Sequence, residues 1–363
     1  MKDLLKTTLL MANIAVFGIG LQGPATAQQV PPSPVFNDSQ PGSVLVFPKF
    51  DESENHATEL RITNTHDSEY VGVRFDIICP GVKGFKAESR CESTDVHRRI
   101  SPHGTVVFDV GAYAQCDEGF VVAIAEEAPA TATQPSSGRP ISWNYLTGSY
   151  HIISSDGAEA DQAIAIQSSQ PVFDPAAPVY LDPEGDGLQF GTPATGAGTQ
   201  DYVPLGTTLY TDFRAGGMVA DQPEEQLGSE LVLLSLDIIV GAQNPPTLVN
   251  INFWNENQVQ YSASVEYVCW TRLPLEEISE LFLADNLGTA TGSMTLTPAE
   301  NCPIAGACAP QGPLTPYRPV ILGAIDEYGA GFQTKRNLYH DDVPNGTIYS
   351  TNLPAPVAPP TIE

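Results

Sequence analysis

The chain has 363 residues, with 16 lysines and arginines against 43 aspartates and glutamates, so its formal net charge is −27. A surface this acidic repels nucleic acid and anionic membranes, and neither is expected as a partner. With 42% hydrophobic residues, 32 prolines and 31 glycines, the composition is typical of a globular all-β protein with many turns rather than of a disordered chain.

The first 27 residues follow the pattern of a secretory signal peptide. Lys2 and Lys6 precede an apolar stretch over residues 9–21, and small residues follow at Ala25 and Ala27. The stretch is shorter than the roughly 20 residues needed to span a bilayer, and no later run is apolar enough to insert. We therefore expect cleavage after Ala27 and a secreted protein, whether periplasmic, extracellular or on the cell surface.

The remaining length predicts two domains with polar, proline-rich segments around them. The expected order is a disordered N-terminal segment at 28–42, a β-sandwich domain at 43–169, a Pro/Gly/Asp-rich linker at 170–206, a second β-sandwich domain at 207–351 and a Pro-rich tail at 352–363.

Short runs with alternating apolar residues predict the strands. In "YVGVRFDIIC", for example, Val71, Val73 and Phe75 share one face while Arg74 and Asp76 share the other. Similar signals occur at 43–50, 59–65, 104–110, 121–127, 141–146 and 162–168, and then at 207–213, 230–240, 248–255, 260–270, 292–298, 321–327 and 346–351. Many short strands separated by turn residues favour two tandem immunoglobulin-like β-sandwiches. The helical spacing of apolar residues at 273–284 predicts one short helix in the second.

The two halves share three blocks in the same order, which predicts an internal repeat. "ELRITNT" matches "LVNINFWN", the strand that ends at Cys79 matches the one that ends at Cys269, and "VVAIAEE" matches "ILGAIDE". The acids that close the last two blocks, Glu126 with Glu127 and Asp326 with Glu327, are expected to be solvated strand ends.

The even number of cysteines in an exported chain favours disulfides over metal binding or thiol chemistry. The six candidates are Cys79, Cys91, Cys116, Cys269, Cys302 and Cys308. One scheme joins Cys302 to Cys308 and Cys79 to Cys91, which leaves Cys116 and Cys269 for a bridge between domains. The other joins Cys79 to Cys116 and Cys269 to Cys302, which leaves Cys91 and Cys308 over.

No catalytic motif occurs, and we expect no enzyme and no cofactor other than calcium. The six histidines, at positions 56, 66, 97, 103, 151 and 340, are interpreted as surface residues. In "DPEGDG", Asp182, Glu184 and Asp186 alternate before a glycine as calcium ligands do, although position twelve of the pattern is Pro193. This weak metal site competes with its interpretation as a plain acidic turn.

The segments "SVLVFPKF", "ELRITNT", "ISWNYLTG" and "NFWNENQ" together resemble a loosely defined set of exported bacterial proteins with tandem immunoglobulin-like domains. The resemblance implies export and fold, but no mechanism and no site residue. We expect a secreted or surface-associated structural or interaction protein with an unknown protein or glycan partner.

The first alternative is a carbohydrate-binding or calcium-dependent adhesive module. Its platforms would be Trp254, Trp270, Tyr145 and Trp143, although sandwich cores commonly bury a tryptophan. The second alternative is an exported hydrolase.

Overall fold

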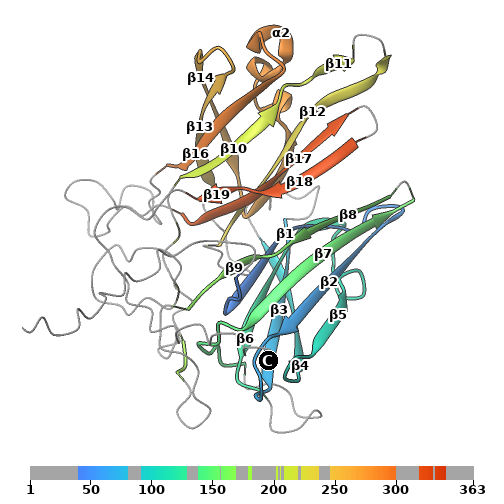
Figure 1. The fold of residues 1–363 in the computed structure, drawn as a ribbon, viewed down its shortest axis with the longest axis vertical. Helices are drawn as coiled ribbons and strands as arrows, with labels where there is room; N and C mark the ends of the chain where they lie inside the picture. Colours follow the sequence, from blue (N-terminus) through green and yellow to red (C-terminus); the bar gives the residue numbers. More distant parts are fainter. Residues whose placement is uncertain are drawn as a thin grey trace, which may run out of the picture.

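The computed structural model describes residues 40–80, 91–128, 138–155, 157–168, 179–181, 202, 205, 208–219, 222–236, 246–299, 319–329 and 332–340. Within these residues the fold is all-β, with four antiparallel sheets that form two stacked sandwiches (Figure 1). The predicted all-β class is therefore confirmed. None of the described helices has the length and hydrophobicity needed to cross a bilayer.

The first sandwich packs a sheet of order β4-β3-β6-β1-β9 against one of order β5-β2-β7-β8. Its strands are β1 (Val44–Asp51), β2 (His56–Asn64), β3 (Val71–Cys79), β4 (Glu92–Ile100), β5 (Thr105–Asp109), β6 (Glu118–Glu126), β7 (Leu146–Ser154), β8 (Gly157–Gln162) and β9 (Ile164–Ile166). The alternating residues Val71, Val73 and Phe75 enter the core between these sheets, together with Phe47 and the buried Trp143. The alternation of apolar residues in the sequence thus predicted correctly which face of β3 is buried.

The second sandwich packs a sheet of order β14-β13-β16-β10-β19 against one of order β11-β12-β17-β18, with β15 also paired to β12. Its strands are β10 (Leu209–Arg214), β11 (Gly217–Val219), β12 (Gln222–Ser235), β13 (Thr247–Asn255), β14 (Gln260–Tyr267), β15 (Trp270–Pro274), β16 (Thr291–Pro298), β17 (Ile321–Gly329), β18 (Phe332–Asn337) and β19 (Tyr339–His340). In its core Phe253 stacks on Phe282, and Phe213 contacts both rings edge to face.

A third hydrophobic layer joins the two sandwiches. Val44 and Val46 of β1 and Phe120 of β6 point away from the first core and pack with Val232 of β12 and Leu322 of β17. The sheets are therefore stacked four deep, and the middle two are covered on both faces. Strands covered on both faces are apolar at successive positions, which explains why β1 is buried over its whole length.

Part of the predicted linker belongs to this third layer. Leu181, Tyr202 and Leu205 are buried in it, and Tyr202 forms an isolated antiparallel β-bridge with Ser168. Each such side chain contributes about 1.5 to 3 kcal/mol when it leaves water. These three residues of the segment thus stabilise the junction between the sandwiches.

Two local predictions were wrong in detail. The helix predicted at 273–284 is divided into the single turns α1 (Leu275–Ile278), η1 (Glu280–Phe282) and α2 (Ala284–Leu287), because Ser279 is extended and its side chain caps the second turn. Residues 142–145 of the predicted strand 141–146 are irregular, since Asn144 has a positive φ of 52°. The hydroxyl of Ser43 accepts hydrogen bonds from the backbone N–H groups of Trp143 and Asn144.

The strand pairings do not reproduce the predicted internal repeat. In the first half β3 pairs directly with β6, the strand that contains "VVAIAEE". In the second half β14, the expected equivalent of β3, pairs with β13 in one sheet, whereas "ILGAIDE" forms β17 in the other. The matched blocks are therefore common β patterns placed differently in the two sandwiches.

Candidate functional site

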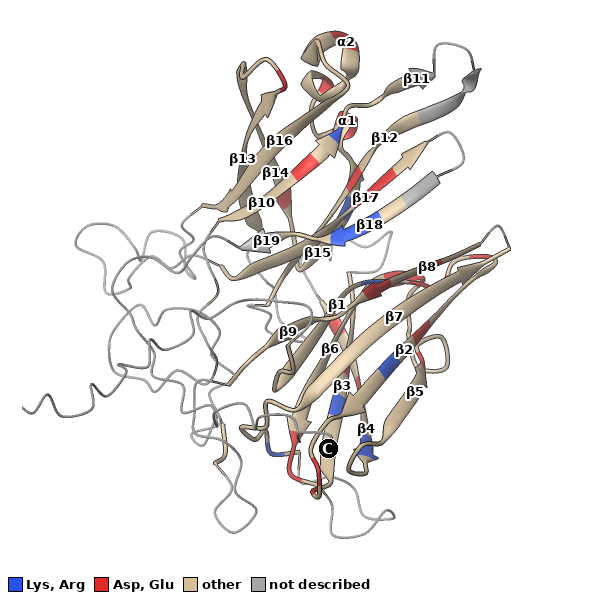
Figure 2. Ribbon diagram, in the orientation of Figure 1, with Lys and Arg blue, Asp and Glu red and all other residues tan. Residues whose placement is uncertain are grey.

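Ionic side chains are buried where the two sandwiches meet. The ammonium of Lys49 in β1 lies 3.0 Å from a carboxylate oxygen of Asp326 in β17, and both side chains are 2% exposed. Glu159 of β8 lies 3.6 Å from the same ammonium. Figure 2 shows acidic residues on β17 beside basic residues on β18 at this level of the molecule. The expectation that Asp326 and Glu126 are solvated was wrong, since both are buried.

A second ionic centre lies beside the first. Arg272 of β15 contacts Glu230 of β12 in its own sandwich and reaches Asp51 and Glu118 of the other at 3.2 and 2.6 Å. Near it, the indole N–H of Trp270 donates to the carbonyl of Pro48 at 2.9 Å. These contacts tie the second sandwich to the bulge in β1, where the register shifts between Phe47 and Phe50.

Burial and charge act in opposite directions on the pKa values of this junction. Burial opposes the charge of Lys49, but Asp326 and Glu159 outweigh it and raise the pKa of Lys49. Burial likewise opposes the charge of Asp326, yet Lys335 and Lys49 hold its pKa below the ordinary value. For Lys335 burial prevails and lowers the pKa to about 8. The Lys49–Asp326 pair is thus ionised at neutral pH.

Two disulfides join cysteines within the described part of the chain. Cys79 at the end of β3 is bonded to Cys116, and Cys91 is bonded to Cys269 of the other sandwich. The first bond matches one of the two predicted schemes. The second joins the two sandwiches as the other scheme expected, but Cys269 is bonded to Cys91 rather than to Cys116. The predicted Cys79–Cys91 and Cys269–Cys302 bonds were therefore wrong. Disulfides are typical of proteins in oxidising, extracellular environments.

A histidine lies between two carboxylates on β4 and β6. One ring nitrogen of His97 lies 2.8 Å from the buried Glu126 and the other lies 3.3 Å from Asp95. Arg74 also reaches Glu126 at 3.6 Å. A general base needs a ring nitrogen directed at its substrate. Because each nitrogen of His97 has a carboxylate partner, this cluster suits a structural role.

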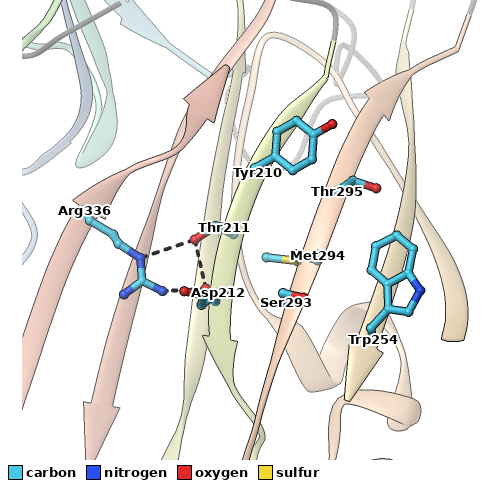
Figure 3. A pocket seen from close by; sticks show the side chains of 8 residues that line it. All are labelled: Tyr210, Thr211, Asp212, Trp254, Ser293, Met294, Thr295 and Arg336. Carbon is cyan, nitrogen blue, oxygen red and sulfur yellow. Dashed lines mark hydrogen bonds between the residues drawn. The ribbon is translucent and has the colours of Figure 1, made fainter. Parts of the chain in front are cut away.

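A groove of about 720 Å³ crosses the outer face of the second sandwich (Figure 3). Leu209, Phe213, Phe253 and Met294 point into the core, so the alternate residues of the same three strands point outward. The outward side chains that line the groove are Tyr210 and Asp212 of β10, Ser293 and Thr295 of β16 and Trp254 of β13. In the sheet Asp212 pairs with Ser293, and Ser293 with Trp254. We call this surface the outer groove.

Arg336 closes one end of the outer groove. Its guanidinium donates to the hydroxyl of Thr211 and to the carbonyl of Asp212, at 3.3 and 2.6 Å, and pairs with Glu327 at 2.8 Å. The groove continues past Glu256 and Thr291, which are hydrogen bonded to one another. Its only basic lining residue among those described is thus already neutralised by a carboxylate.

Several polar groups of the outer groove have no protein partner among the described residues. These are the Tyr210 hydroxyl, the Asp212 carboxylate, the Ser293 hydroxyl and the Trp254 indole N–H. Ser293 lies on β16, between the strands that carry the two aromatic rings, and Tyr210 is 44% exposed. The groove therefore offers both flat apolar surface and unused hydrogen-bonding groups to a ligand.

Of the four predicted aromatic platforms, only Trp254 lies in this groove. Trp143 and Trp270 are buried, and Tyr145 packs against His66 and Trp143. Tyr210 was missed because an outward tyrosine in a strand gives the same alternation as any exposed residue. The calcium candidates Asp182, Glu184 and Asp186 lie outside the described residues, as do Cys302 and Cys308.

No protein-family model matches this chain, and no curated protein is significantly similar to it.

Proposed function

We propose that this is an exported structural or interaction protein without catalytic activity, in which two sandwiches form one rigid body that presents its outer faces to a partner. The observation that carries the proposal is the junction. A continuous hydrophobic layer, a disulfide and the buried Lys49–Asp326 pair all cross it. Relative motion of the sandwiches would expose both apolar surface and unpaired charge, so the body is fixed.

The immunoglobulin-like interpretation remains part of this proposal. In the first sandwich β2 pairs with β5 and β3 pairs with β6. These two pairs interleave along the chain, as they do in a Greek key. In the second sandwich β13 pairs with β16 and β12 pairs with β17, so one pair lies inside the other along the chain. The pairing supports an immunoglobulin-like first domain more strongly than a second.

The absence of catalysis is supported by the way in which the ionisable groups are used. Asp326, Glu230 and Glu118 are paired with cations at the junction, and His97 is held between carboxylates. Groups used in this way hold the fold together rather than transfer protons to a substrate. The exported hydrolase therefore stays the weakest alternative.

Carbohydrate binding is favoured as a second candidate by the outer groove. Trp254 and Tyr210 lie on one exposed sheet face with polar side chains between them. The calcium-dependent form of this alternative rests on Asp182, Glu184 and Asp186 and stays a prediction.

Two measurements test the leading proposal. Fractionation of producing cells should place the protein in the periplasm, the envelope or the medium, and recovery in the cytoplasm would contradict export. Purified protein should not release product from chromogenic esters, peptides or glycosides. Turnover that is lost in a His97→Ala variant would show that the His97 cluster is catalytic.

A further inference from the structure

We infer that the outer groove binds a neutral oligosaccharide, through stacking on Trp254 and Tyr210 and hydrogen bonds to Asp212 and Ser293. The inference rests on the proposed function, because it names the class of partner for a non-catalytic binding protein. The outer groove has a volume of about 720 Å³, which lies within the range of roughly 300 to 1,000 Å³ that is typical of ligand sites.

The spacing of the aromatic rings suits a ligand longer than one sugar. Tyr210 lies on β10 and Trp254 on β13, with β16 between them. Tyr210 pairs with Thr295 whereas Trp254 pairs with Ser293, so the two residues are also offset by two positions along the strands. Two strand separations and this offset together amount to about 12 Å. A sugar ring has apolar C–H faces that stack on an aromatic ring and hydroxyl groups at its edge. A chain laid across the three strands would place a ring face on each aromatic residue.

The polar groups of the outer groove match the edges of sugars. The Asp212 carboxylate accepts hydrogen bonds, the Trp254 indole N–H donates them, and the Ser293 hydroxyl does both. Asp212, Ser293 and Trp254 are neighbours in one cross-strand row. A ligand that spans the two rings therefore meets this row of acceptors and donors at the Trp254 end of the groove.

The negative charge around the outer groove favours a neutral ligand over an anionic one. Asp212, Glu256 and Glu327 are acidic, and Arg336 is paired with Glu327 and with the carbonyl of Asp212. The whole chain is acidic as well. Glycans with uronate, sulfate or phosphate groups would be repelled.

Affinity electrophoresis in native gels is the first test. The gels contain hydroxyethyl cellulose, barley β-glucan, galactomannan or, as the anionic control, polygalacturonate. We expect retardation in at least one neutral polysaccharide and none in polygalacturonate. A hexasaccharide of the retarding polymer then gives the dissociation constant by calorimetry. No retardation in the neutral gels, or a preference for polygalacturonate, would overturn the inference.

Surface variants locate the binding. Trp254→Ala and Tyr210→Ala should each weaken binding at least tenfold, and Trp254→Phe should weaken it less than Trp254→Ala. Tyr70→Ala is the matched control, because Tyr70 is 42% exposed but lies on the first sandwich. Unchanged circular dichroism and thermal midpoints verify the fold of each variant. Equal affinities for all the variants would place the glycan elsewhere and refute the site.

The outcomes separate this inference from the proposed function. If no glycan binds, the groove assignment fails while a non-catalytic interaction protein stands. If a neutral polysaccharide binds and new reducing ends appear, the site is right and the non-catalytic proposal fails. Intrinsic fluorescence gives a further check, since Trp143 and Trp270 are buried and a ligand-induced change would report on Trp254.

Discussion

Replacing Lys49 with methionine tests whether the two sandwiches are held together by buried charge. The substitution keeps an unbranched side chain that is one atom shorter, but leaves the Asp326 carboxylate at the junction without its partner at 3.0 Å. Removing one member of a buried ion pair costs about 3 to 5 kcal/mol. Lys335 and Arg272 still act on Asp326, so we expect a loss at the lower end, about 3 kcal/mol.

Urea unfolding followed by circular dichroism at pH 7 measures this loss. An Asp326→Asn variant and the double variant complete a double-mutant cycle. The sum of the two single losses in unfolding free energy should exceed the loss in the double variant by more than about 1 kcal/mol. Arg61→Met is the control, because Arg61 and Glu59 form a pair on the surface, where ion pairs contribute about 0 to 1 kcal/mol. A loss below about 1 kcal/mol for Lys49→Met, or an additive cycle, would refute the reasoning.

The loss should also be constant from pH 5 to about pH 7, below the pKa of about 8 at which Lys335, the other lysine beside Asp326, loses its charge. The pKa of Lys49 is raised when the chain folds, so its contribution is present below the ordinary lysine pKa and is lost only as the pH rises beyond it. The pKa of Asp326 is lowered, so its contribution is lost only as the pH falls below the ordinary aspartate value. A loss that changes within this window would show that other groups control the pair.

Three further predictions concern the junction and the cysteines. Replacing both Cys91 and Cys269 with alanine should lower the free energy of unfolding by up to about 5 kcal/mol, because the bond closes a loop of 178 residues; a change within error in urea unfolding would contradict this. The buried ammonium of Lys335 has a pKa of about 8, below that of the unfolded chain, so stability should rise by up to about 3 kcal/mol between pH 8 and 10.5 in the wild type but not in Lys335→Met. Alkylation of the denatured, unreduced protein should label at most two thiols, those of Cys302 and Cys308, and four or more labels by intact mass would disprove the two disulfides.

The sequence was sufficient to predict most strands and the all-β class, because burial of one sheet face imposes a period of two that needs no knowledge of the partner sheet. The run at Val71, Val73 and Phe75 is an example, since these residues enter the first core as predicted. The sequence also offered the Cys79–Cys116 bond as one of two alternatives for Cys79, and the structure confirms it. These features depend on residues close in the chain or on one face of one strand.

The tertiary structure alone decided which polar residues are buried and which outward residues meet. Lysine side chains are ordinarily exposed, but Lys49 of β1 is buried at the junction, where Asp326, 277 positions away in the chain, neutralises it. Trp254 and Tyr210 belong to strands that are not adjacent in the chain, and only β16 between them makes one groove. The alternation of a strand states which side chains face outward, but sheet order determines their neighbours, and sheet order depends on pairings between distant segments that no local pattern encodes.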